Sequence, residues 1–294
     1  MLHRNFAMLV LPFSLWFGCS SATQVAPPTG EPPTGPSPND EHGLCPSARG
    51  LTVETCRAQH PPAGYGTTLA VPVEWGVTSA GAMYFGRLLC PSGALAVAQR
   101  RQYPGLSKTP HEEWTLHCPG EVENHTWYTN PQKCGNPCPP EGFMVIPSAA
   151  LRAYMASVER LQSGDLGRAQ QQAELAVKLA PPNELLTSWL ATMLTQTGKP
   201  EKAVELFESV IRMNPEDPHP KLYLAMAQRA AGYDGPYHAA IAELLTKLPE
   251  DHPLVAELKC LRAEKLRADG KAPEAARLTA ESCKGGWDAC CADK

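Results

Sequence analysis

The sequence predicts a mainly α-helical protein, in which a run of helix-turn-helix repeats follows a small, disulfide-rich and mostly β module. Two observations carry this prediction. After Pro147, apolar residues recur at the spacing of one helix face, and a set of glycine, alanine and proline recurs at fixed distances. Before Pro147, short aromatic runs are separated by proline and glycine, and six of the 11 cysteines lie between residues 42 and 147.

The N-terminal segment is expected to direct export. Residues 1–18 consist of a short basic start followed by an apolar run of 12 residues from Phe6 to Phe17. This run is too short to cross a bilayer and has the proportions of a signal peptide. It ends at Gly18-Cys19-Ser20-Ser21, which resembles a bacterial lipoprotein signal and implies that Cys19 becomes the lipid-modified first residue. Cleavage after Ala22, which discards Cys19, is the alternative.

Residues 19–41 join the lipidated cysteine to a stretch rich in proline, glycine, serine and threonine. Such a composition has little to bury, so the segment is expected to be an extended tether. Ser20 directly after the cysteine resembles the outer-membrane sorting type of Gram-negative bacteria. We therefore expect an exported, outer-membrane-anchored lipoprotein, with the periplasmic and surface faces both left open.

Residues 42–147 are expected to form the β module. Alternating and aromatic runs at Leu69–Trp75, Glu113–His117 and His125–Tyr128 predict strands, and proline and glycine between them predict turns. Cys90-Pro91-Ser92-Gly93 and Cys118-Pro119-Gly120 indicate one device used twice, a cysteine that ends a strand before a tight turn. A module of this size gains stability from covalent cross-links.

Cysteine usage agrees with export. Once Cys19 is set aside, ten cysteines remain, an even number that suits disulfides in an oxidising compartment. In an antiparallel helix pair Cys260 and Cys283 lie at similar heights, which favours a bridge between them. The pairing of Cys290 and Cys291 stays open, within a C-terminal tail at 290–294. The cysteines predicted to form disulfides are Cys45, Cys56, Cys90, Cys118, Cys134, Cys138, Cys260 and Cys283.

Residues 148–289 carry the repeats. Gly164 is followed by Ala169, Ala173, Ala176 and Pro181, and Gly198 is followed at the same offsets by Ala203, Phe207, Val210 and Pro215. Gly232 and Gly270 begin weaker copies. This order, at a period of 34 residues, resembles the tetratricopeptide repeat, which implies a helical solenoid of three to four repeats. Ala173 stands where that family usually has an aromatic residue. In the third repeat Tyr237 replaces the small alanine, unless the register shifts to Ala239 or Ala240.

The resemblance implies that the first helix of each repeat lines a groove for another protein. Such a groove accepts an extended peptide or a helix. The residues placed there are Tyr154, Val158, Ser188, Thr192, Gln196, Met226 and Arg229. The apolar members of this set are equally compatible with the core.

The leading interpretation is a non-enzymatic adaptor of the bacterial cell envelope, for which a pilotin-like assembly factor is one example. No catalytic or phosphate-binding motif is found, the net charge is −4, and no basic stripe indicates nucleic acid. A zinc site at Cys134 and Cys138 is disfavoured because export favours their oxidation, and no cofactor is expected.

Two further readings remain. In the first, the cysteine-rich module carries the activity, as an enzymatic domain or as a glycan-binding domain that uses Trp75, Trp114 and Trp127. In the second, the protein is purely structural.

Overall fold

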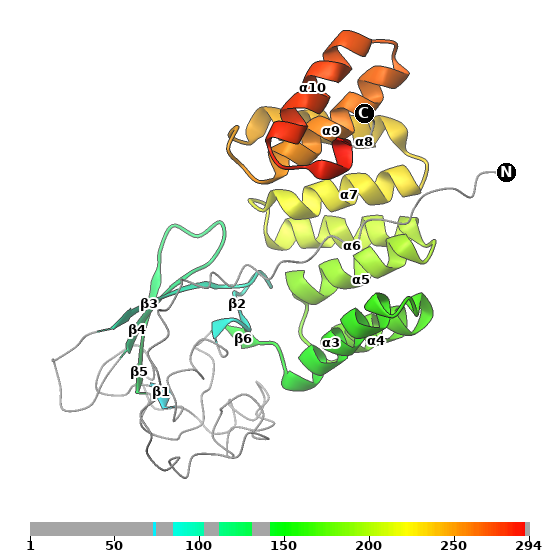
Figure 1. Cartoon of the computed structure of the whole chain (residues 1–294). Helices are drawn as coiled ribbons and strands as arrows, with labels where there is room; N and C mark the ends of the chain where they lie inside the picture. Colours follow the sequence, from blue (N-terminus) through cyan, green and yellow to red (C-terminus); the bar gives the residue numbers. More distant parts are fainter. Residues whose placement is uncertain (1–72, 75–84, 103–111, 131–141, 292–294) are drawn as a thin grey trace, which may run out of the picture. The chain divides into compact units, whose positions relative to one another are not determined.

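A computed structural model describes residues 73–74, 85–102, 112–130 and 142–291 (Figure 1). The signal peptide, the tether, Cys19 and Trp75 lie outside the described residues, as do Cys45, Cys56, Cys134 and Cys138. The described strands are β1 (Val73–Glu74), β2 (Leu88–Leu89), β3 (Val97–Gln102), β4 (Glu112–His117), β5 (His125–Asn130) and β6 (Met144–Val145). The described α-helices are α3 (Ser148–Gln162), α4 (Leu166–Lys178), α5 (Glu184–Gln196), α6 (Pro200–Met213), α7 (Pro218–Ala230), α8 (Asp234–Lys247), α9 (Leu254–Ala268) and α10 (Ala272–Lys284).

The described strands form two sheets. Four of them have the order β1-β5-β4-β3, with β3, β4 and β5 antiparallel and β1 parallel to β5. The other two, β2 and β6, pair antiparallel. Residues of β4 alternate between buried and half-buried, which is the period expected of a strand with one face on a core.

A small aromatic core and one disulfide hold these strands. Phe85 packs 4.3 Å from Trp114 between ring centroids, and Trp127 completes the cluster. Cys90 follows β2, Cys118 follows β4, and the two are bonded to each other. Each cysteine carbonyl accepts a backbone hydrogen bond from the residue three positions on, Gly93 and Glu121, so both cysteines do open tight turns. The two similar turns, at Cys90 and at Cys118, are therefore joined to each other by one disulfide.

The eight described α-helices form four antiparallel pairs, α3 with α4, α5 with α6, α7 with α8 and α9 with α10. The turn glycines Gly164, Gly198, Gly232 and Gly270 all have positive φ, between 75° and 84°, which residues with a Cβ rarely adopt. Five residues after each glycine a side chain is buried between the two helices: Ala169, Ala203, Tyr237 and Ala275. The predicted helical repeats are confirmed, and Tyr237 takes the place of the small alanine without a shift of register.

The first helix pair has alanine where the second pair has a buried aromatic residue, and an aromatic side chain of the second pair fills the space. Phe207 of α6 is buried, nine residues after its turn glycine, where α4 has only Ala173. Trp189 of α5 packs in the same cluster as Ala173, together with Met193. Its indole Nε1 donates to the Ser157 hydroxyl over 2.7 Å. The first pair is thus filled by a side chain that the pattern within that pair does not contain.

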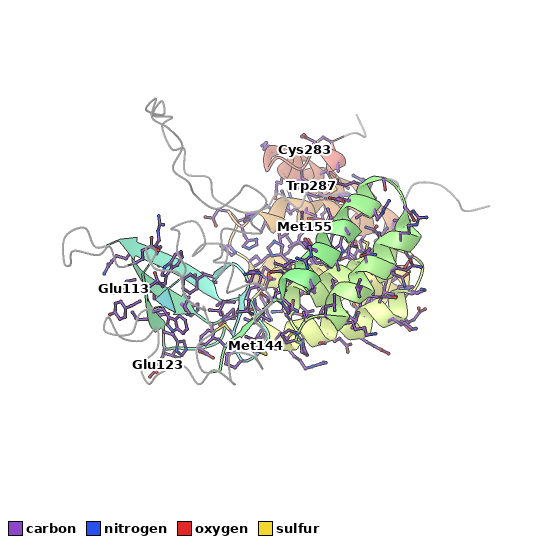
Figure 2. All side chains as sticks on the ribbon, turned by 90° about the horizontal axis from the view of Figure 1, so that it is seen from below. Glu113, Glu123, Met144, Met155, Cys283 and Trp287 are labelled. Carbon is purple, nitrogen blue, oxygen red and sulfur yellow. A yellow bond between two sulfur atoms is a disulfide. The ribbon has the colours of Figure 1, made fainter. Side chains whose placement is uncertain are left out.

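The last pair is closed by two disulfides. Cys260 on α9 is bonded to Cys290, and Cys283 on α10 is bonded to Cys291. The predicted bridge between Cys260 and Cys283 is therefore wrong. A 3-10 helix at Asp288–Cys290 folds the chain back after α10, near Cys283 and Trp287 in Figure 2, and brings the adjacent cysteines to different helices.

Strands and helices share a core where the chain passes from one to the other. Leu89 and Ile146 are buried with Ala150, Ala153 and Leu186. The Leu95 amide donates to the Glu184 carboxylate over 2.8 Å, and the Glu184 amide donates to the Gly93 carbonyl over 3.0 Å.

This attachment leaves no room for a side chain at Gly93. A Cβ at that position would lie 2.8 Å from the Pro182 carbonyl oxygen, in the turn between α4 and α5. The turn after β2 therefore lies directly against backbone of the first two helix pairs.

In the described part of the chain, no helix has the length and apolar character needed to cross a membrane.

The packing of Trp189 makes a testable prediction. Ala173→Phe is expected to destabilise the protein by about 1–3 kcal/mol, because the space over Ala173 already holds an indole and overpacking forces neighbours out of place. Urea unfolding measures the change. In a Trp189→Ala background the same substitution should cost less, since the space is then empty. An Ala173→Phe variant with unchanged or increased stability would contradict this account.

Candidate functional site

The four helix pairs place residues at equal distances before their turn glycines in equivalent positions. We call one side of the helices α3, α5, α7 and α9 the first-helix face. It carries the residues that lie 13, 10 and 6 positions before the turn glycine of each pair. At position 13 these are Leu151, Leu185, His219 and Glu257. At position 10 they are Tyr154, Ser188, Leu222 and Cys260, and at position 6 they are Val158, Thr192, Met226 and Glu264.

The predicted groove residues differ in burial from one helix pair to the next. Tyr154 and Val158 pack on the cluster of Ala169, Ala173, Trp189 and Met193, and the Tyr154 ring meets Trp189 edge-on at 5.3 Å. These two residues are therefore partly core. Ser188 and Thr192 are half-buried, and the Thr192 hydroxyl donates to the Ser188 carbonyl. Gln196 is exposed.

On the third pair, Met226 is half-buried at the edge of the Leu222–Tyr237–Leu258 cluster. Arg229 is exposed and pairs with Glu264 of α9 at 3.2 Å. Its guanidinium also lies 5.0 Å from the centroid of the Tyr237 ring. Of the predicted groove residues on α7, only Arg229 makes a charged contact with the neighbouring first helix.

The first-helix face changes its chemistry along the repeats. Leu151 and Leu185 pack in one cluster with Leu95 and Met144, so the β module covers part of the first two pairs. The equivalent residues on α7 and α9 are His219 and Glu257. Apart from Glu184 at its start, α5 carries no charged side chain. The first-helix face is thus apolar and covered at Leu151 and Leu185. It is polar and uncharged at Ser188 and Thr192, and it carries ionisable groups at His219 and Glu257.

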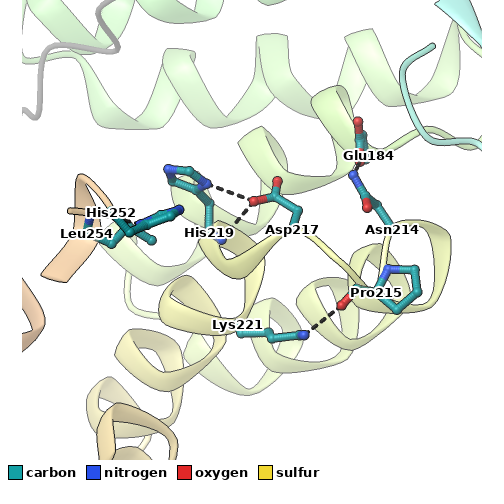
Figure 3. Close-up of polar contacts among 8 residues, drawn as sticks. All are labelled: Glu184, Asn214, Pro215, Asp217, His219, Lys221, His252 and Leu254. Atoms are coloured by element: carbon teal, nitrogen blue, oxygen red, sulfur yellow. Dashed lines mark hydrogen bonds and ion pairs between the residues drawn. The ribbon is translucent and has the colours of Figure 1, made fainter. Parts of the chain in front are cut away.

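Asp217 and His219 form the best-defined polar contact of the charged part (Figure 3). Asp217 is the N-cap of α7 and accepts from the His219 amide over 2.9 Å and from the ring Nδ1 over 2.7 Å. Burial alone would raise the pKa of Asp217, but the bonds from His219 outweigh it and the pKa lies below its usual value. The same bond raises the pKa of His219, against the opposing effect of burial.

Glu257 is the site residue that the sequence analysis missed. Its side chain is buried, with 6% of the residue exposed. Burial raises the pKa of Glu257 to about 7, and the positive charge of His219 only partly opposes this. Among the described residues its carboxylate has no hydrogen-bond or ion-pair partner. Its place in the repeat could have identified it from the sequence, because Glu257 precedes Gly270 by 13 residues, as His219 precedes Gly232.

A second, half-buried carboxylate, Glu184, lies at the start of α5. Burial raises the pKa of Glu184, while bonds from the Leu95 amide and the Asn214 side chain lower it, and the negative charge of Asp217 raises it further. Asn214 Oδ1 is itself buried without a partner among the described residues. Lys221 donates to the Pro215 carbonyl instead of to either carboxylate (Figure 3). The carboxylates of Glu184 and Asp217 therefore lie beside the first-helix face, and the charges of His219 and Lys221 act on Asp217.

Metal binding was tested in the same residues. No cluster of three or more histidine, cysteine, aspartate or glutamate side chains in the described ranges has the geometry to hold a metal ion. Cys118 is bonded to Cys90 and so does not serve as a thiolate ligand. Cys134 and Cys138, the pair considered for zinc, lie outside the described residues.

Comparison with known proteins gives structural likeness only. No family model and no curated protein matches the chain. MamA residues 41 to the end, from Desulfovibrio magneticus RS-1, is 15% identical over 47% of this chain and 75% of its own, with a TM-score of 0.40. YrrB, titled a TPR protein with an unusual peptide-binding site, is 17% identical over 47% of this chain and 69% of its own, with a TM-score of 0.38. The translocator chaperone SycD of Yersinia enterocolitica type III secretion is 16% identical over 38% of this chain and 87% of its own, with a TM-score of 0.34.

With TM-scores this low, the assignment depends on the helix pairs themselves. Their turn glycines and buried residues decide it, together with the 34-residue spacing of the first three glycines. The fold is a solenoid of tetratricopeptide-like repeats.

Glu257 predicts a pH-dependent stability. Its folded pKa of about 7 lies above the usual value of 4.5, so between these pH values the folded state binds a proton that the unfolded state has lost. Stability should therefore fall as pH rises through this window, by about 3 kcal/mol at most, since one pKa unit corresponds to about 1.4 kcal/mol. The raised pKa of His219 acts in the same direction, because its contribution is lost as pH rises through its folded value.

The measurement is urea unfolding at about pH 5 and about pH 8, with Glu257→Gln as the comparison. The substitution removes the titrating group and keeps its shape, so the variant should lose less stability than the wild type as the pH rises. Equal losses in both proteins would show that Glu257 does not titrate in this range.

Proposed function

We propose that this protein is a non-enzymatic scaffold that holds a segment of another protein on the first-helix face. One observation carries the proposal: equivalent positions of consecutive helix pairs present different side chains, hydroxyls of Ser188 and Thr192 on α5 and charged groups of His219 and Glu257 on α7 and α9. A packed solenoid holds such side chains at fixed intervals, and their differences allow it to select one sequence over another. The packed helices also keep the ordering cost of binding low.

The anchoring part of the proposal comes from the N-terminal pattern. A lipid on Cys19, followed by a tether at 19–41, would keep the repeats at a bacterial membrane while leaving them free to meet an envelope protein. A pilotin-like assembly factor would work in this way. A single lipid anchor and the lack of a basic stripe in the sequence also suit a protein partner better than nucleic acid.

The competing glycan-binding reading is weakened by burial. Trp114 and Trp127 are 5% and 1% exposed and pack on Phe85, so neither offers its ring to a sugar. Trp75 lies outside the described residues. The structural reading predicts no saturable partner, and the capture experiment below separates it from the scaffold.

Two threonines give a matched test of the scaffold. Thr192 on α5 and Thr246 on α8 each donate a hydroxyl hydrogen bond to a carbonyl of their own helix, but Thr246 is exposed on the second helix of its pair. Thr192→Arg should reduce capture of the partner from solubilised envelope at least tenfold, because a long charged side chain then fills the uncharged part of the face. Thr246→Arg should capture as the wild type does.

Capture is quantified by mass spectrometry at increasing bait concentration, after circular dichroism has shown that both variants keep their helices. A saturable partner held equally by both arginine variants would place binding elsewhere on the protein. No saturable partner at all would favour the purely structural reading.

The anchor is tested separately by Cys19→Ala. The lipid is attached to this thiol, so the variant should move from the membrane fraction to the soluble fraction and should not incorporate labelled palmitate. Fractionation and fatty-acid labelling measure both effects. A Cys19→Ala protein that still incorporates labelled palmitate would overturn the anchor at this thiol and leave the scaffold proposal standing.

A further inference from the structure

The feature that the scaffold proposal does not explain is the buried carboxylate of Glu257. A buried charge is costly unless an opposite charge or hydrogen-bond donors compensate it. Glu257 is 6% exposed and has no hydrogen-bond or ion-pair partner among the described residues, and the charge of His219 acts on it only from a distance. A bound group of opposite charge would offset this cost, and the oxygens of Glu257 are not among the fully buried unpaired atoms of the described residues.

The position of Glu257 places it on the first-helix face. It is equivalent to His219 on the preceding first helix, and the two side chains interact electrostatically. Its negative charge also acts on Tyr223 of α7, together with that of Asp217. Glu257 thus occupies on α9 the position that the exposed His219 occupies on α7.

The neighbouring cations of the described chain are already engaged. The His219 ring is bonded to Asp217, and Lys221 to the Pro215 carbonyl. On α9 itself, Lys259 pairs with Glu250 and Glu281. The carboxylates Glu184, Asp217 and Glu257 thus lie near the starts of successive first helices; the charges of His219 and Lys221 act on Asp217, and that of His219 acts on Glu257.

We propose that Glu257 anchors a lysine or arginine side chain of the bound segment, which continues across α7 to uncharged residues that lie along Ser188 and Thr192 of α5. This rests on the proposed scaffold function. An ammonium or guanidinium group would supply the missing donors and turn the buried carboxylate into a charge-assisted pair, which is among the stronger polar contacts in proteins. The acidic surroundings favour a cation and disfavour an acidic peptide.

A metal ion fits this place less well than an organic cation. The described carboxylates and histidines here do not converge into a group of three that could coordinate one. A guanidinium needs only one carboxylate and tolerates partial exposure. The α5 row, which lies beyond α7 on the same face and is uncharged, is why a single basic residue, rather than a polybasic segment, is expected.

The experiment selects peptides from a random nonapeptide display library on the full exported chain. Peptides bound by the wild type should be enriched in lysine or arginine at one fixed position. Glu257→Gln should lose this enrichment, and Glu257→Asp should retain it in part. Glu243→Gln is the matched control, since Glu243 lies on α8 and pairs with Lys247 on an exposed surface, and it should select as the wild type does.

An enriched arginine peptide is then remade with citrulline, which keeps the shape and removes the charge. The wild type should bind the citrulline peptide at least tenfold more weakly, and Glu257→Gln should bind both peptides alike. Enrichment of peptides without a basic position, or unchanged discrimination in Glu257→Gln, overturns the anchor while the scaffold stands. A library that gives no enriched peptide on any of these proteins counts against the scaffold and the anchor together.

Discussion

The close approach of paired helices at their glycine turns is the constraint on which the rest of the repeat region depends. A turn residue with positive φ lets the chain reverse within a few residues, and the side chain five positions later is buried between the two helices. Because this geometry recurs in all four pairs, residues at equal distances before the glycines fall on one face. Leu185, His219 and Glu257 can be compared as one row of the face only because they hold equivalent positions in their helix pairs.

The first repeats are also a support for the β module. Glu184 accepts a hydrogen bond from Leu95 and donates its own amide to Gly93, and apolar residues from both parts form one cluster. Two hydrogen bonds with a shared core are worth more than either alone, since the core excludes water from the polar contact. The cost is that Leu151 and Leu185 are covered, so the third and fourth pairs carry most of the surface chemistry.

Stability and recognition conflict at Glu257. A buried, uncompensated carboxylate weakens the folded protein at neutral pH, whereas the disulfides from Cys260 and Cys283 strengthen the same terminal pair. Among the described pairs, α9 and α10 adjoin another pair on one side only, so cross-links there offset the contacts that a second neighbour would supply. This combination suits a repeat that must hold a charged position without fraying.

The amino-acid sequence by itself determined the helix pairs, their turns and the buried small residues, because these follow from local periodicity and from what glycine, alanine and proline allow. It also supplied Ser188, Thr192 and Arg229 as candidate surface residues, and the paired turns at Cys90 and Cys118. Only the tertiary structure decided that Trp189 fills the space over Ala173, that Cys260 bonds to Cys290, and that Glu257 is buried beside His219. Each of these joins residues from different helices or turns, and such contacts depend on how the elements pack together, which no local pattern encodes.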